Sequence, residues 1–148
     1  SQSHSLKQPC DLPDLLEAGT QNVHGLAGLC AGISYILDIG VETILAHEQR
    51  LVKLFIDGIR SLPGMVIYRP DCRRVGTVAL NVADVSPAEL CEWLAMEDVC
   101  VRGGAHCAPL AHDAIGTWES GAVRFSFGWT TTEQEVQKGI DILKHFVS

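Results

Sequence analysis

A short glycine-rich segment, residues 102–109 (RGGAHCAP), carries the residue types in this chain that are most able to do chemistry. Two glycines before His106-Cys107, and a proline soon after, predict a loop with an unusual backbone and an accessible thiol. A thiol close to arginine and histidine can act as a nucleophile. Cys107 is therefore a candidate nucleophile, and the alternative is a packing cysteine beside a surface histidine.

Two arginines stand out because they are isolated from other cations. From residue 75 to residue 137, the only lysines or arginines are Arg102 and Arg124. Each lies in or at the end of an apolar stretch that we predict to be a strand. An unpaired buried guanidinium is costly, and its planar fork matches a carboxylate through two hydrogen bonds. The sequence therefore predicts an anionic partner, which is either a bound carboxylate or an aspartate or glutamate of the chain.

The same region offers a different chemistry, because it also reads C-x5-H-C-x4-H through Cys100, His106, Cys107 and His112. Thiolate and imidazole are the ligands that zinc prefers in proteins. The closely spaced ligand pairs of structural zinc sites are missing, so we predict no metal. A zinc- or thiol-binding module built on these four residues stays as the alternative from another functional class.

A Gly19-Thr20 turn shortly before a predicted helix is a candidate anion site. Backbone N–H groups and a hydroxyl in such a position can bind phosphate. Thr20 or Asn22 as an ordinary helix N-cap is the alternative. The chain contains no Walker or dinucleotide-binding glycine motif.

Composition narrows the functional classes further. The chain has 148 residues, of which 47% are hydrophobic, and a net charge of −7, which predicts a globular protein rather than a nucleic-acid binder. The longest apolar run, residues 23–37, is too short to span a bilayer. The chain opens SQSHSLKQPC without a signal peptide, and we interpret it as a piece of a longer protein. Its six cysteines are expected to be reduced thiols in a cytoplasmic setting.

The elements that would position these residues follow from hydrophobic spacing and capping signals. Residues 1–16 are predicted to form an irregular arm, and residues 1–148 a single domain. Its class is α+β: a small, mostly antiparallel sheet covered by helices and preceded by two long helices. The predicted helices cover 22–37 and 41–62 and begin after the N-caps Ser86 and Thr132, and the predicted strands cover 65–68, 76–82, 99–102 and 122–127.

Three motifs, EAGTQNVHGLAGL, DVCVRGGAHCAPLAH and GAVRFSFGWTTTEQE, together resemble the C-terminal part of a cysteine desulfurase. These enzymes are class V members of the fold-type I, pyridoxal-phosphate-dependent aminotransferase superfamily. The resemblance covers residues 13–143 and is closest to the branch with an R-x-G-x-H-C loop, also called selenocysteine lyases. Gln21 replaces a frequent proline, and Trp129-Thr130-Thr131 replaces a more usual aromatic-x-Asn.

The resemblance implies a role for each matching residue. Cys107 would attack the sulfur of the cysteine substrate, leaving alanine and a persulfide on Cys107. Arg124 would bind the substrate carboxylate, and Arg102 and His106 would line the same pocket. Residues 19–20, Gly19 and Thr20, would contact the phosphate of pyridoxal phosphate in the neighbouring subunit of a homodimer.

The resemblance also implies what this chain lacks. The family's Schiff-base lysine lies in a large domain upstream of the three motifs, and the lysines here are Lys7, Lys53, Lys138 and Lys144. We therefore expect the isolated chain to be inactive. The expected partners of the parent enzyme are L-cysteine, a sulfur-acceptor protein such as one of iron–sulfur assembly, a second copy and the missing N-terminal domain. Alternative substrates within the family are selenocysteine and cysteine sulfinate.

Overall fold

A computed structural model describes residues 10–17 and 19–148, and they fall into two compact units, residues 1–40 and residues 41–148. In the first unit, residues 10–17 form turns, closed by Leu15 N–H donating to the carbonyl of Asp11 at 2.9 Å. The rest of the predicted arm, residues 1–9, lies outside the described residues. A single domain over 1–148 stays a prediction, because the two units are described separately.

The first unit contains one helix, α1 (Val23–Ile39). Asn22 caps it, since its side-chain oxygen accepts a hydrogen bond of 3.0 Å from the backbone N–H of Gly25. Gly40 ends it with a φ of +90°, a value that glycine adopts without strain. None of the side chains of α1 is buried.

The second unit holds a four-stranded antiparallel sheet in the order β1-β2-β4-β3. Its strands are β1 (Met65–Ile67), β2 (Thr77–Val82), β3 (Arg102–Gly104) and β4 (Ala122–Ser126), and its helices are α2 (Val41–Ile59), α3 (Pro87–Met96), α4 (Pro109–Ala114) and α5 (Glu133–Phe146). The predicted α+β class and the antiparallel sheet are thereby confirmed.

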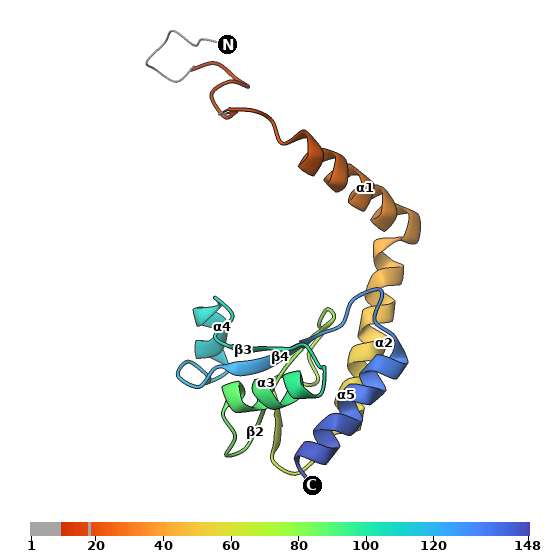
Figure 1. The fold of residues 1–148 in the computed structure, drawn as a ribbon, viewed down its shortest axis with the longest axis vertical. Coiled ribbons are helices and arrows are strands. Elements are labelled where there is room, and N and C mark those ends of the chain that lie inside the picture. Colours follow the sequence, from red (N-terminus) through yellow and green to blue (C-terminus); the bar gives the residue numbers. More distant parts are fainter. Residues whose placement is uncertain (1–9, 18) are drawn as a thin grey trace. The chain divides into compact units, whose positions relative to one another are not determined.

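One face of this sheet forms the core with three of the helices. Alternate residues of β2 and β4, among them Leu80 and Val123, are fully buried. They pack with the apolar side of α2, where Phe55 lies 4.7 Å from Phe125 between ring centroids, and with α5 and α3. Figure 1 shows α5 running along α2, with α3 and α4 on opposite sides of the strands. The three helices that pack on the core, α2, α3 and α5, therefore cover only one face of the sheet.

The strand predicted over residues 99–102 is wrong in its position, since β3 begins only at Arg102. Val99 N–H donates to the carbonyl of Leu94 at 2.8 Å. The residues just after α3 therefore belong to the turn that ends this helix and not to a strand. Gly103 does not break the strand. A Cβ there would lie 2.8 Å from Sγ of Cys91, so only glycine lets β3 pass over α3.

No single helix of the described part of the chain is long and apolar enough to cross a bilayer. Only α1 and α2 taken together reach the necessary length and composition, with a break between them at Gly40.

The capping box at α5 makes a stability prediction. The hydroxyl of Thr132 accepts from Glu135 N–H, and Glu135 Oε2 accepts from Thr132 N–H at 2.7 Å. The Thr132 hydroxyl also donates to Glu135 Oε2 at 2.8 Å. The bond from the backbone N–H of Thr132, and then this bond from its hydroxyl, lower the pKa of Glu135 below its ordinary value of 4.5. We expect Thr132→Ala to lower the free energy of unfolding by about 1 kcal/mol at pH 7.

The pH dependence of this loss has a defined sign. A depressed carboxyl pKa contributes stability above the unfolded value, and that contribution is lost as the pH falls through the folded value. The difference between the native chain and Thr132→Ala should therefore shrink between pH 5 and pH values below the folded pKa of Glu135. Urea unfolding at several pH values measures it, and a difference that stays constant with pH would contradict the assignment.

Candidate functional site

Cys107 lies on a tight turn whose backbone is unusual for the residues that form it. His106 and Cys107 have φ values of +53° and +56°, and Ala108 N–H donates to the carbonyl of Ala105 at 2.9 Å. Two consecutive positive φ angles inside a four-residue hydrogen-bonded turn are the pattern of a type I′ turn, which favours asparagine and glycine. The side chain of Cys107 is exposed at the corner of this turn.

This turn stores backbone strain at an exposed cysteine. A left-handed conformation costs an ordinary L-residue roughly 1–2 kcal/mol, and such costs persist chiefly at sites where function requires them. Neither His106 nor Cys107 is replaceable by glycine without loss of its side-chain chemistry. The strain therefore supports a functional role for this turn.

Because the turn is strained, we expect glycine at position 107 to make the chain more stable, although glycine lacks the thiol that the chemistry requires. We expect Cys107→Gly to raise the free energy of unfolding of the chain by about 0.5–1 kcal/mol relative to Cys107→Ala, because glycine adopts the positive φ freely. Chemical unfolding of the two variants, which both lack the thiol, measures this difference. An alanine variant that is as stable as the glycine variant would show that the turn is unstrained.

Arg102 and Arg124 are brought together by the register of the sheet. They are directly opposite partners in the antiparallel pair of β3 and β4, so their side chains leave the same face of the sheet. This is the second face, because Val123 and Phe125 on either side of Arg124 point into the core. Ala79 is opposite Arg124 on β2, and its small side chain leaves room beside the guanidinium.

No carboxylate of the described residues pairs with either arginine, since the ion pairs of this part of the chain all involve other cations. Nε of Arg124 is buried and has no hydrogen-bond partner. Like charges directly opposite each other repel, and a buried donor without an acceptor is costly. Of the two partners that the sequence left open, a bound anion agrees with this arrangement and an internal carboxylate does not.

The turn and the arginine pair are joined by His106. Its Nε2 lies 2.9 Å from the backbone carbonyl oxygen of Arg102, which can only accept. The structure thus places Cys107, His106, Arg102 and Arg124 along β3, β4 and the loop that follows β3. Gly19, with a φ of +81°, and Thr20 belong to the first unit, where Asn22 rather than Thr20 caps α1.

The zinc alternative finds no support in the geometry. Among the described residues, no group of three or more histidine, cysteine, aspartate or glutamate side chains could hold a metal ion. His106 and His112 do meet, with Nδ1 of the first 3.3 Å from Nε2 of the second. In this structure the two nitrogens face each other as a hydrogen-bonded pair, and no third ligand joins them among the described residues.

Three thiols near the site differ in their surroundings. Cys91 lies on α3 beneath Gly103, and burial raises the pKa of its thiol. A partly buried thiol with a raised pKa forms less of the reactive thiolate at neutral pH than an ordinary cysteine does. Cys100 and Cys107 are exposed, and both are free thiols. Cys91 is therefore a packing residue, and Cys107 is the exposed thiol on the strained turn.

Sequence reasoning missed three polar residues that shape the site. Asn81 donates to the carbonyl of Gly121 at 3.0 Å and accepts from Val123 N–H at 3.3 Å, which fixes the start of β4. A single amide inside the apolar strand TVALNV was the signal for it. His112, whose environment was considered only for zinc, and Thr117 are buried beside the turn. The short helix α4 was also missed, although Pro109 at its first turn is a typical start signal.

One hollow of the second unit lies away from these residues. It has a volume of about 530 Å³ and lies between α2 and the loop of residues 70–74, and it contains none of the predicted site residues. The side chains of Arg102 and Cys107 are both exposed to solvent. A ligand bound there would need further residues to enclose it.

Comparisons with known proteins agree with this geometry. A probable cysteine desulfurase of Halalkalibacterium halodurans is 34% identical over 92% of this chain, which covers 34% of that protein. A cysteine desulfurase of Haloferax volcanii is 33% identical over 90% of this chain, which covers 31% of that protein. This chain thus spans about a third of the length of the curated relatives that it matches.

Solved structures give the same result. An apo cysteine desulfurase from Thermococcus onnurineus superposes with a TM-score of 0.83 at 34% identity, over 91% of this chain and 34% of that one. A cysteine desulfurase from Escherichia coli superposes with a TM-score of 0.80 at 26% identity, over 90% of this chain and 32% of that one. The profile of the aminotransferase class-V family matches residues 3–138. These four relatives carry the names cysteine desulfurase or probable cysteine desulfurase. The chain itself belongs to the class-V aminotransferase family.

Proposed function

We propose that this chain is the C-terminal domain of a cysteine desulfurase that converts L-cysteine to L-alanine and holds the released sulfur as a persulfide on Cys107. The observation that carries the proposal is an exposed cysteine on a strained turn beside an arginine pair, in which Nε of Arg124 is buried without a partner. Similarity to cysteine desulfurases over about nine-tenths of the chain supports it.

Each residue has a defined part in the proposed reaction. Arg124 binds the substrate carboxylate through its guanidinium, and this pairing satisfies the buried Nε. Arg102, on the same face, adds positive charge that strengthens carboxylate binding. His106 contributes by holding the turn, through its bond to the carbonyl of Arg102.

The sulfur transfer itself occurs at Cys107. Its thiolate attacks the sulfur of the substrate cysteine, so that an S–S bond forms while the bond between that sulfur and the substrate carbon breaks. The electron pair of the broken bond stays with the carbon, which takes up a proton and becomes the methyl group of alanine. The persulfide sulfur on Cys107 is then available to a sulfur-acceptor protein.

Pyridoxal phosphate, the cofactor of this family, would supply the electron sink for this bond cleavage. Of the described lysines, Lys53 is paired with Asp57 on α2, Lys144 is paired with Asp141 on α5, and Lys138 is also on α5. We propose that the lysine that holds the cofactor lies instead in the part of the relatives that this chain does not span. Gly19 and Thr20 are proposed to bind its phosphate across a homodimer of a cytoplasmic enzyme.

Product formation tests the proposal. A longer protein, in which the remaining two-thirds of the relatives' length precedes this chain, should form alanine from L-cysteine in the presence of pyridoxal phosphate. The 148-residue chain alone should form none. Parallel assays with selenocysteine and cysteine sulfinate define the substrate preference. Alanine formation by the isolated chain, or none from any of the three substrates by the longer protein, would refute the proposal.

A further inference from the structure

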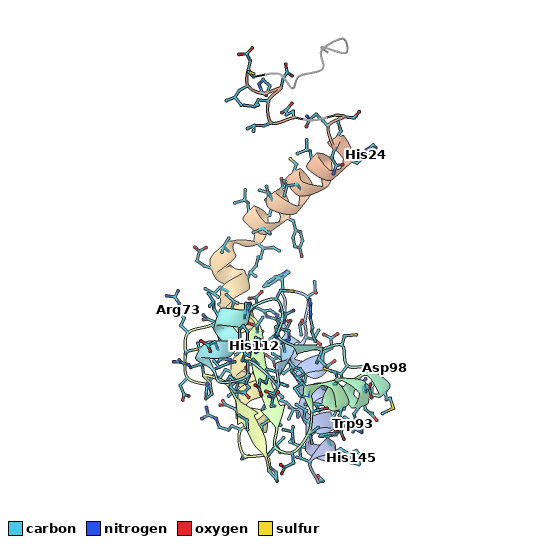
Figure 2. All side chains as sticks on the ribbon, turned by 90° about the vertical axis from the view of Figure 1, so that its left-hand side faces the viewer. His24, Arg73, Trp93, Asp98, His112 and His145 are labelled. Carbon is cyan, nitrogen blue, oxygen red and sulfur yellow. The ribbon has the colours of Figure 1, made fainter. Side chains whose placement is uncertain are left out.

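Two buried polar side chains lie directly behind the Cys107 turn. His112, on α4, is 4% exposed and Thr117, in the loop after α4, is 3% exposed; they are the buried polar residues of the described part of the chain. Figure 2 labels His112 on the short α4 ribbon. Nδ1 of His112 lies 2.7 Å from the hydroxyl of Thr117, and Thr117 N–H donates to the carbonyl of His112 at 2.8 Å. Burying polar groups is costly unless they are hydrogen-bonded, so the burial of His112 and Thr117 has to be explained by the bonds that they make.

The pair continues a chain of hydrogen bonds whose direction can be deduced. The carbonyl of Arg102 can only accept, so Nε2 of His106 carries the proton in their 2.9 Å bond. Nδ1 of the neutral His106 ring then accepts, so Nε2 of His112 donates to it across 3.3 Å. By the same reasoning Nδ1 of His112 accepts, and the hydroxyl of Thr117 donates. Each donor in this series of three hydrogen bonds therefore has one acceptor.

This chain of bonds engages both ring nitrogens of His106. The ring therefore has no free nitrogen to take the proton of Cys107, even though the two residues are adjacent in the sequence. What the bonds do instead is connect the strained turn to the buried part of the domain. They tie residue 106 to β3 on one side and to α4 on the other, and so offset the cost of the two positive φ angles.

We propose that His112 and Thr117 are positioning residues that hold His106 in the Nε2–H tautomer and thereby fix the strained turn of residues 105–108. The importance of this for catalysis rests on the role proposed above for Cys107. The ordering of the turn does not rest on it, because the bonds lie within this chain.

Hydrogen exchange of the Ala108 amide tests the proposal on the 148-residue chain, because this N–H closes the turn. His112→Leu replaces the buried ring by an apolar side chain and removes both bonds, and Thr117→Val removes only the hydroxyl. Each lost bond is expected to speed exchange at Ala108 by a few-fold, and His112→Leu by about ten-fold. His112→Gln keeps an N–H that can donate to His106 and should restore much of the protection. The core amides of β2 and β4 serve as the internal control.

Nitrogen-15 spectra of the histidine rings give a second readout. Both His106 and His112 should show the neutral Nε2–H form in the native chain. If His112→Leu does not fold, Thr117→Val and the native spectrum still decide the question. The proposal is overturned if either ring is in the Nδ1–H form, or if Ala108 exchanges equally in the native chain and in the folded variants. Neither measurement involves cofactor or cysteine turnover, so its failure is distinguishable from failure of the desulfurase proposal.

Discussion

Replacing Cys107 by serine is expected to lower alanine formation from L-cysteine by on the order of 10³-fold or more in the longer protein. A hydroxyl is far less nucleophilic toward sulfur than a thiolate, and the serine variant cannot hold a persulfide. The backbone of the turn should be unchanged, since serine has nearly the same shape as cysteine. The measurement is steady-state alanine production with saturating L-cysteine.

The matched control for this prediction is Cys100→Ser. Cys100 is also an exposed free thiol, but it lies before β3 rather than on the strained turn. We expect the Cys100 variant to keep nearly full activity. Equal losses in the two variants would show that the thiols act through the fold, and full activity of the Cys107 variant would remove Cys107 from the mechanism.

Arg124→Met is expected to change activity and stability in opposite directions. Loss of the guanidinium should lower kcat/KM for L-cysteine by about 100-fold or more in the longer protein, because the substrate carboxylate loses a charged, two-pronged partner. Methionine keeps the unbranched stem but carries neither a charge opposite Arg102 nor a buried Nε without an acceptor. The free energy of unfolding of the 148-residue chain should therefore rise by about 1 kcal/mol.

Two further variants separate charge from geometry at this position. Arg124→Lys keeps the charge but has only a point donor, so its kcat/KM should fall between those of the native protein and Arg124→Met. Arg73→Met removes an exposed arginine of the loop after β1 and should change neither quantity. If Arg124→Met destabilises the chain while leaving kcat/KM unchanged, then Arg124 is a structural residue and not the carboxylate partner.

The elements that could be predicted from the sequence are those determined by neighbouring residues. Thr132 and Ser86 cap helices through bonds to residues three positions further along, so short motifs contain all the necessary information. The position of β3 could not be predicted in this way. It depends on the closeness of Cys91 to Gly103, a contact between segments that only the folded chain brings together.

The candidate site shows the same division. A reactive loop at Cys107 and two unusual arginines were visible in the sequence, because their composition is exceptional. That Arg102 and Arg124 are directly opposite each other is a property of strand register, which no local pattern specified. The hydrogen bonds from His112 to His106 and Thr117 were hidden for a related reason, since the spacing of the histidines suggested metal ligands instead.

The central claim is that sulfur passes from the substrate to Cys107, and mapping of the persulfide tests it most directly. The longer protein would be mixed with L-cysteine and pyridoxal phosphate, its thiols and persulfides alkylated, and its peptides analysed by tandem mass spectrometry. The account predicts one additional sulfur on the peptide that contains Cys107, lost in Cys107→Ser and retained in Cys100→Ser. Additional sulfur on Cys100 or another cysteine, with none on Cys107 while alanine is formed, would contradict it.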